Sequence, residues 1–111
     1  MTEIVPLNQI NPEPLSRTVR AFAMVRGDRV LGEAGAFIEA GAWVVYSDVT
    51  PEGWKDTRTA LRLWRTVLAA IKDSGIPIQA IADPAIEASE RFLEHIGFRR
   101  LIGQTYQWEG D

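Results

Sequence analysis

Residues 49–71 read VTPEGWKDTRTALRLWRTVLAAI, and within this stretch the spacing of the apolar residues changes from that of a strand to that of a helix. The run AWVVYSDV (42–49) leads into it and is apolar enough for a buried strand. After Thr50 the apolar residues recur at intervals of three and four, as they do on one face of an amphipathic helix. They are Ala60, Leu61, Trp64, Val67, Leu68 and Ile71. The stretch therefore predicts a strand that leads directly into a long helix.

The sequence on the N-terminal side predicts an antiparallel meander. TVRAFAMV (18–25), the turn RGDR (26–29) and the run at 30–49 read as strand, turn, strand, turn and strand, with small residues at the bends. EIVPLN (3–8) reads as a further short strand. Pro6 predicts that this strand lies at the edge of the sheet, because proline cannot donate a ladder hydrogen bond.

The C-terminal side predicts a strand, a second helix and two closing strands. Gly75 ends the long helix, and PIQAIAD (77–83) reads as a short strand. Asp83 then caps the second helix, and Pro84 takes its first position. The expected buried face of this helix consists of Ile86, Ser89, Phe92, Leu93 and Ile96, and Gly97 is its expected C-terminal cap. Residues 99–104 and 105–110 are the expected closing strands. This order predicts an α+β fold with a mixed, mostly antiparallel sheet and two main helices (β-βββ-α-β-α-ββ).

The composition is that of one folded domain. A chain of 111 residues, 46% hydrophobic and 24% charged, is long enough for a single core and short for two. The absence of cysteine excludes disulfides and thiolate chemistry, and with one histidine no metal site is expected. The net charge of -3 gives no general attraction to nucleic acid or to an anionic membrane. No apolar run approaches the roughly 20 residues of a membrane helix, and the N-terminus lacks a signal-peptide pattern, so we expect a cytoplasmic protein.

The segment ASERFLEHIGFRRL (88–101) resembles the C-terminal half of the GNAT acetyltransferase superfamily. In that superfamily a helix ends in an aliphatic-Gly-Phe signature before the last strands, and IGF (96–98) matches it. Together with the order of elements, the resemblance covers residues 19–108 and implies a single GNAT-like domain over residues 1–111. The two N-terminal helices of the superfamily have almost no room in residues 7–17, so the N-terminal helical region is expected to be reduced.

The resemblance implies that acetyl-coenzyme A (acetyl-CoA), if the protein is active, binds where the strand at 42–49 meets the long helix. The superfamily carries a Gln/Arg-x-x-Gly-x-Gly/Ala loop there, whose backbone N–H groups bind the pyrophosphate at the helix N-terminus. The lead-in is kept in VTPE (49–52), but the glycine-rich positions are taken by Lys55, Thr57 and Thr59. We therefore expect a degenerate loop. The candidate cofactor-binding residues, if binding is retained, are Val49, Gly53, Lys55 and Arg58.

The resemblance also implies candidate catalytic groups. A strand glutamate is the usual base or water-positioning group of the superfamily, which indicates Glu33 and Glu39, and Tyr46 could hydrogen-bond a ligand near the thioester. The same three side chains have an ordinary interpretation as two solvated carboxylates and a sheet aromatic. The tyrosine that commonly protonates the leaving thiolate has no counterpart, because Leu93 stands at its position. His95 fits a helix C-terminus, where a cation is stabilised, and is interpreted as structural.

Three functions are consistent with these residues. The first is a non-catalytic GNAT-fold protein that acts through contacts with protein partners or as a homo-oligomer. SERFLEHIGF (89–98) is similar to GNAT-like proteins of tailed phages, including the internal virion protein family, which implies a structural or accessory component of a phage, located in the virion. The second function is that of an N-acetyltransferase, which moves an acetyl group from acetyl-CoA to an amine. The third, nucleic-acid binding by Arg58, Arg62 and Arg65, is least favoured because the chain is acidic.

Overall fold

The structure, a computed structural model, describes residues 2–7, 20–82 and 89–110. In chain order its elements are β1 (Thr2–Pro6), β2 (Arg20–Arg26), β3 (Arg29–Glu39), β4 (Ala42–Val49), α1 (Pro51–Lys55), α2 (Thr57–Ile71), β5 (Ile78–Ile81), α3 (Ser89–His95), β6 (Phe98–Ile102) and β7 (Thr105–Trp108). The predicted α+β fold class is confirmed. The expectations for the N-terminal helical region and for Asp83, Pro84 and Ile86 lie outside the described residues.

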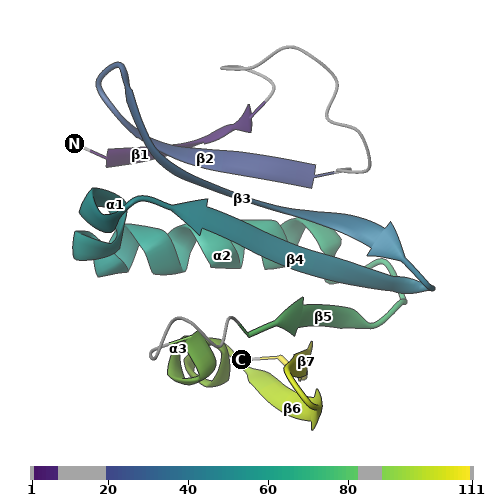
Figure 1. Cartoon of the computed structure of the whole chain (residues 1–111). Helices are drawn as coiled ribbons and strands as arrows, with labels where there is room; N and C mark the ends of the chain where they lie inside the picture. The colour runs from purple at the N-terminus through teal and green to yellow at the C-terminus, as the bar shows by residue number, and fades with distance from the viewer. Residues whose placement is uncertain (1, 8–19, 83–88, 111) are drawn as a thin grey trace.

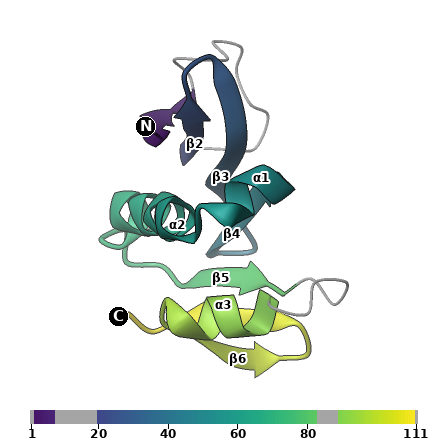
Figure 2. The same ribbon diagram turned by 90° about the vertical axis from the view of Figure 1, so that its left-hand side faces the viewer.

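The seven described strands form one sheet in the order β1-β2-β3-β4-β5-β7-β6. Only β4 and β5 pair in parallel, and the other described pairs are antiparallel. Pro6 lies in β1 at the sheet edge, as predicted. Figure 1 shows α2 behind β3 and β4, and Figure 2, which looks nearly along α2, shows this helix on one side of the sheet. Within the described ranges, no helix is both long and apolar enough to cross a membrane.

The core lies between α2 and the sheet, because the apolar face of α2 packs against β1 to β4. The buried residues of the helix are Thr59, Ala60, Leu63, Trp64, Val67, Leu68 and Ile71. Five of the six predicted positions are among them. Leu61 is half-buried at the border of this face, whereas Leu63, which the sequence analysis left out, is fully buried. Leu63 lies one turn before Val67 and therefore on the same stripe.

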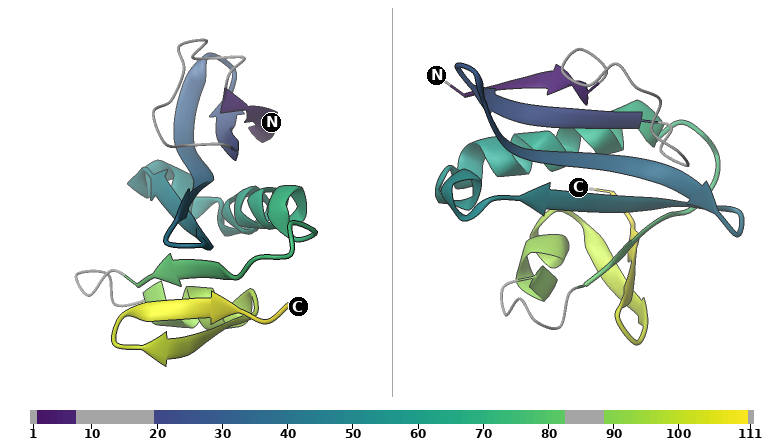
Figure 3. Two further views of the ribbon diagram at one scale, coloured as in Figure 1. Left: turned by 90° about the vertical axis from the view of Figure 1, so that its right-hand side faces the viewer. Right: turned by 45° about the horizontal axis from the view of Figure 1, so that its top comes forward.

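The strands β4 and β5 separate after a short parallel ladder. The ladder joins Trp43, Val44 and Val45 to Ile78, Gln79 and Ala80. These register pairs end at Val45 and Ala80, whereas β4 itself continues to Val49. The right-hand view of Figure 3 shows the two strands running apart toward their C-terminal ends. The sheet is therefore splayed at the end where β4 leads into α1.

The predicted glycine cap between α3 and β6 is confirmed. Gly97 has a φ of 104°, a conformation that favours glycine, and its N–H donates to the Glu94 carbonyl at 3.2 Å. Phe98 follows it and is fully buried in the core. Trp108 Nε1 donates to the Ile96 carbonyl at 2.9 Å, so the end of β7 is fixed to the end of α3.

Candidate functional site

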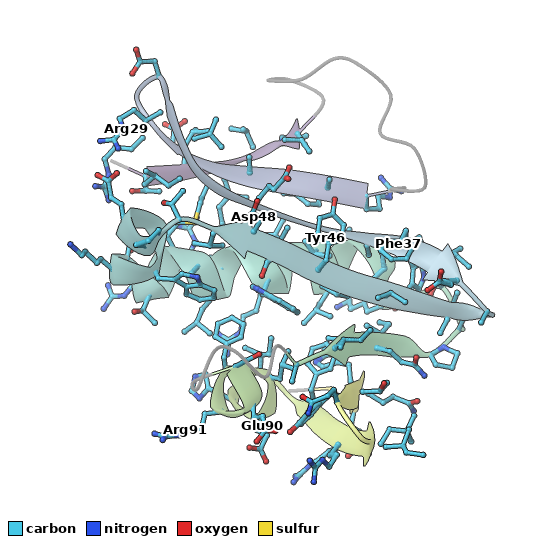
Figure 4. All side chains as sticks on the ribbon, in the orientation of Figure 1. Arg29, Phe37, Tyr46, Asp48, Glu90 and Arg91 are labelled. Atoms are coloured by element: carbon cyan, nitrogen blue, oxygen red, sulfur yellow. The ribbon has the colours of Figure 1, made fainter. Side chains whose placement is uncertain are left out.

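The junction between β4 and α2 is built around Thr50. Its N–H and its hydroxyl both donate to the Leu31 carbonyl at 2.9 Å, which fixes the end of β4 to β3. The Thr50 hydroxyl also accepts from the Gly53 N–H at 3.0 Å and so caps α1. Glu52 forms an ion pair with Arg29 at the start of β3, and Figure 4 shows Arg29 beside α1.

The single helix predicted after Thr50 is wrong, because Asp56 divides it into α1 and α2. Asp56 has a φ of −95° and a ψ of 68°, outside the helical region. It is the N-cap of α2: its Oδ1 accepts from the Thr59 N–H at 3.3 Å and its Oδ2 from the Thr59 hydroxyl at 2.9 Å. Aspartate is among the best N-cap residues, because its carboxylate meets unpaired helix N–H groups and the positive end of the helix dipole.

The carboxylate of Asp56 is therefore an anion that the protein itself supplies at the N-terminus of α2. The hydrogen bond from the Thr59 hydroxyl, the largest cause, holds the pKa of Asp56 below its ordinary value of 3.8. Arg26 Nη2 lies 3.5 Å from Asp56 Oδ2 and favours the charged form as well. At neutral pH a negatively charged carboxylate of the chain itself therefore contacts the N-terminus of α2.

Gly53, the one glycine of the junction, is used for close packing. A Cβ at this position would lie 2.5 Å from the Leu31 carbonyl oxygen and 2.7 Å from Val49 Cγ1. Its N–H already donates to Thr50. Val49 is half-buried against the core, and of the other candidate cofactor ligands Lys55 and Arg58 are exposed. The geometry thus explains Gly53 without a ligand.

The sheet has two arms that diverge beyond the ladder between β4 and β5: one carries α1 and α2, and the other is formed with α3, β6 and β7. Aromatic side chains connect these two arms. Trp54 from α1 meets Phe92 from α3 edge to face, with ring centroids 5.3 Å apart. Trp64 from α2 meets Phe92 at 5.4 Å and Phe98 at 6.1 Å, again edge to face. Such pairs stabilise a contact beyond the area that they bury. Leu93, which stands at the expected position of the proton donor, is buried in the core beside them.

The candidate catalytic residues lie on the face of the sheet opposite α2. Figure 4 shows Tyr46 and Asp48 there, together with Phe37, whose ring centroid is 6.2 Å from that of Tyr46. Glu33 on β3 is the direct cross-strand neighbour of Asp48. The structure thus groups Glu33 with Tyr46, and adds Asp48, which the sequence analysis missed. The alternation of side chains along β4 could have indicated Asp48, because residues 46 and 48 of one strand share a face.

Glu39 does not belong to this group. It is the last residue of β3, exposed and paired with Ala42 beside the hairpin. Six residues of extended strand place it about 20 Å from Glu33. His95 is exposed on the last turn of α3. The described parts of the chain hold no group of three histidine or acidic side chains placed to bind a metal ion.

Tyr106 on β7 is a buried ionisable residue that the sequence analysis did not single out. Burial, first, and the negative charges of Glu90 and Glu94 raise its pKa above the ordinary 10. The folded protein therefore keeps the phenol protonated at a pH where the unfolded chain releases the proton. The stabilisation is complete below pH 10 and is lost as the pH rises through the pKa of the folded state.

We expect the fall in stability above pH 10 to become less steep in Tyr106→Phe, because the variant lacks the phenol whose pKa is raised by folding. Denaturant unfolding at a series of alkaline pH values would measure the slope. The chain has two tyrosines, so in Tyr46→Phe the ultraviolet absorbance titration reports on Tyr106 alone. Ionisation of that tyrosine at or below pH 10 in the folded protein would contradict the prediction.

Comparison with known proteins shows which proteins have a similar fold. No protein-family model and no curated protein sequence matches the chain. Among solved structures, a GNAT-family acetyltransferase from Staphylococcus aureus Mu50 matches with a TM-score of 0.68 at 15% identity, over 92% of this chain and 74% of that one. The ribosomal-protein-S18-alanine N-acetyltransferase from Escherichia coli matches with a TM-score of 0.69 at 11% identity, over 92% and 80%. A chain of the KacTA–DNA complex matches with a TM-score of 0.60 at 20% identity, over 97% and 92%.

At such low identities the similarity concerns the backbone arrangement. The chain has the fold of the GNAT acetyltransferases.

Proposed function

We propose that this protein is a GNAT-fold protein with a degenerate acetyl-CoA loop, which is non-catalytic and acts through contacts with other proteins. The observation that carries the proposal is the Asp56 carboxylate, which caps α2 through the Thr59 N–H and hydroxyl. A helix N-terminus binds phosphate because its N–H groups and dipole favour an anion. Here that anion belongs to the chain.

The residues of the junction do not fit the pyrophosphate of acetyl-CoA. A bound pyrophosphate would stand beside a like charge whose low pKa keeps it ionised. Thr57 and Thr59 carry side chains where a backbone must approach an anion closely. The contact between Trp54 and Phe92 joins α1 to α3 next to the same end of β4. Charge, backbone access and packing all support the non-catalytic proposal.

The alternative is an N-acetyltransferase, and the splay of the sheet favours it. The register pairs between β4 and β5 end at Val45 and Ala80, whereas β4 runs on to Val49. The alternative places acetyl-CoA in the splay beyond these pairs. Glu33 and Tyr46 lie on one face of the neighbouring strands. An amine acceptor must lose a proton before it attacks. The predicted bases are Glu33, Glu39 or a water, and of the two glutamates Glu33 is the one that lies near Tyr46. This function requires an anion to displace the Asp56 contacts.

We further propose that the protein is a structural or accessory component of a phage and is located in the virion. This proposal is supported only by the resemblance of SERFLEHIGF (89–98) to GNAT-like proteins of tailed phages, which is a resemblance of sequence pattern. In that segment Phe92 and Leu93 serve packing, since Phe92 meets two tryptophans and Leu93 is buried. Neither phenylalanine nor leucine can donate a proton, so α3 offers no general acid at these two positions.

Calorimetric titration with acetyl-CoA tests the proposal, and we expect no saturable binding by the unaltered protein. Asp56→Asn keeps a good N-cap but removes the charge, so it should bind inorganic pyrophosphate more tightly than the unaltered protein does. Asp73→Asn, at an exposed position beyond the other end of α2, makes the same charge change and should have no effect.

Micromolar binding of acetyl-CoA would overturn the non-catalytic proposal if Arg58→Glu weakened it and Arg65→Glu did not. Both arginines are exposed on α2, but Arg58 lies in its first turn and Arg65 lies two turns further along. The comparison therefore separates binding at the helix N-terminus from a general effect of charge.

A further inference from the structure

The strand β6 forms one boundary of the sheet. It pairs with β7 on one side, and no described strand lies on the other (Figure 2). Four consecutive residues of β6, Arg99 to Ile102, are exposed, and we call them the β6 edge. An outer strand presents unpaired backbone N–H and C=O groups, which can pair with another extended chain.

The β6 edge lies beside a row of side chains in which two exposed isoleucines flank a half-buried threonine. Ile102 on β6 and Ile81 on β5 are both register partners of Thr105 on β7, so the three side chains lie side by side across the sheet. Ile102 is 74% exposed, Ile81 66% and Leu101 55%, the highest values among the large apolar side chains that the structure describes. A strand added beside β6 would place a side chain next to Ile102 and extend this row.

The polar part of the β6 edge is positive. Arg99 and Arg100 are exposed, in a chain whose net charge is -3. Arg99 Nε lies 3.6 Å from Glu109 Oε1, and Arg100 Nε donates to the Gly103 carbonyl at 3.1 Å. Each guanidinium carries five N–H donors, so both retain donors for a carboxylate. A segment that suits the β6 edge therefore has acidic side chains beside apolar ones.

A second copy of β6 suits this surface poorly. Antiparallel pairing of two such strands would bring four arginines onto one two-stranded ribbon, and like charges across strands are destabilising. Charges on edge strands commonly prevent self-association. The same arginines attract an acidic strand, so the surface discriminates between the two occupants.

We propose that the β6 edge is a docking site for an extended, acidic and apolar segment of a partner protein, which adds to the sheet as a further strand. Main-chain hydrogen bonds would supply part of the affinity, and alternate side chains would supply specificity. The proposal rests on the protein-contact role proposed above and names its surface and the chemistry of its partner.

The test uses two short N-acetylated peptides, one alternating valine with glutamate and one alternating valine with lysine. We expect the unaltered protein to bind the glutamate peptide at least tenfold more tightly than the lysine peptide, measured by fluorescence anisotropy. The double variant Arg99→Glu, Arg100→Glu should reverse this preference. The control Arg62→Glu, Arg65→Glu changes the charge equally on the exposed side of α2 and should leave the preference unchanged.

Hydrogen exchange locates the bound peptide. Amides of residues 99–102 should become protected when the glutamate peptide binds, and Ile102→Ser should weaken binding. No binding of the glutamate peptide, a preference that survives the reversal of both arginines, or protection confined to β1 would overturn the docking site. The peptide experiments and the acetyl-CoA titration measure different binding events. The docking site can therefore be disproved without disproving the non-catalytic proposal.

Discussion

Phe98→Ala is expected to lower the free energy of unfolding by about 3–5 kcal/mol, the usual loss when a buried phenylalanine is truncated. Phe98 is fully buried at the start of β6 and meets Trp64 edge to face. It belongs to the arm formed by α3, β6 and β7, whereas Trp64 belongs to α2. The substitution would therefore remove a contact between the two arms as well as leave a cavity.

The loss is large because domains of this size have a total stability of roughly 5–15 kcal/mol. Urea unfolding followed by circular dichroism would measure it. Leu101→Ala is the matched control, since it truncates an apolar side chain of the same strand at a position that is 55% exposed. We expect its effect to stay within about 0.5 kcal/mol. Equal losses in the two variants would mean that β6 does not pack through Phe98.

Gly53→Ala is expected to cost about 3 kcal/mol, at the upper end of the range for overpacking. The new methyl group would lie 2.5 Å from the Leu31 carbonyl oxygen, which is part of the backbone. That oxygen also accepts both hydrogen bonds from Thr50. Any shift that relieves the overlap therefore weakens the attachment of the β4–α1 junction to β3.

The double variant Val49→Ala, Gly53→Ala identifies which neighbour matters. Val49 Cγ1 would lie 2.7 Å from the new methyl group, and truncation at position 49 removes this second overlap. If the backbone oxygen dominates, the double variant is no more stable than Gly53→Ala. Full recovery of stability, measured by thermal unfolding, would show that the side chain of Val49 was the obstacle.

Local patterns predicted most of the fold. The strands at the two ends of the meander, the edge position of Pro6 and the cap at Gly97 each follow from residues that are close in sequence. The helix break at Asp56 was missed, although the signal was present: an aspartate three residues before Thr59 is a good N-cap. The long apolar pattern after it outweighed that signal.

The candidate site was predictable only in part. The sequence showed that the junction lacks the glycines of the superfamily's cofactor loop, but not that the carboxylate of Asp56 contacts the N-terminus of α2. The contact of Asp56 with Arg26 and that of Trp54 with Phe92 join segments far apart in the chain. Glu39 was grouped with Glu33 by residue type, whereas distance along β3 separates them. Such facts depend on tertiary structure, which periodicity does not encode.

The short parallel ladder between β4 and β5 also has a consequence for chain entropy. Parallel strands cannot be joined by a hairpin, and the connection from Val49 to Ile78, which contains α1 and α2, is the longest between any two paired strands that the structure describes. The entropy lost on closing a loop grows with its length, and only three register pairs, Trp43 to Val45 with Ile78 to Ala80, are gained here in return. In backbone pairing alone, the ladder between β4 and β5 thus has the least favourable ratio of register pairs to loop length among the described strand pairs, so its closure depends on the packing of α2 against the sheet.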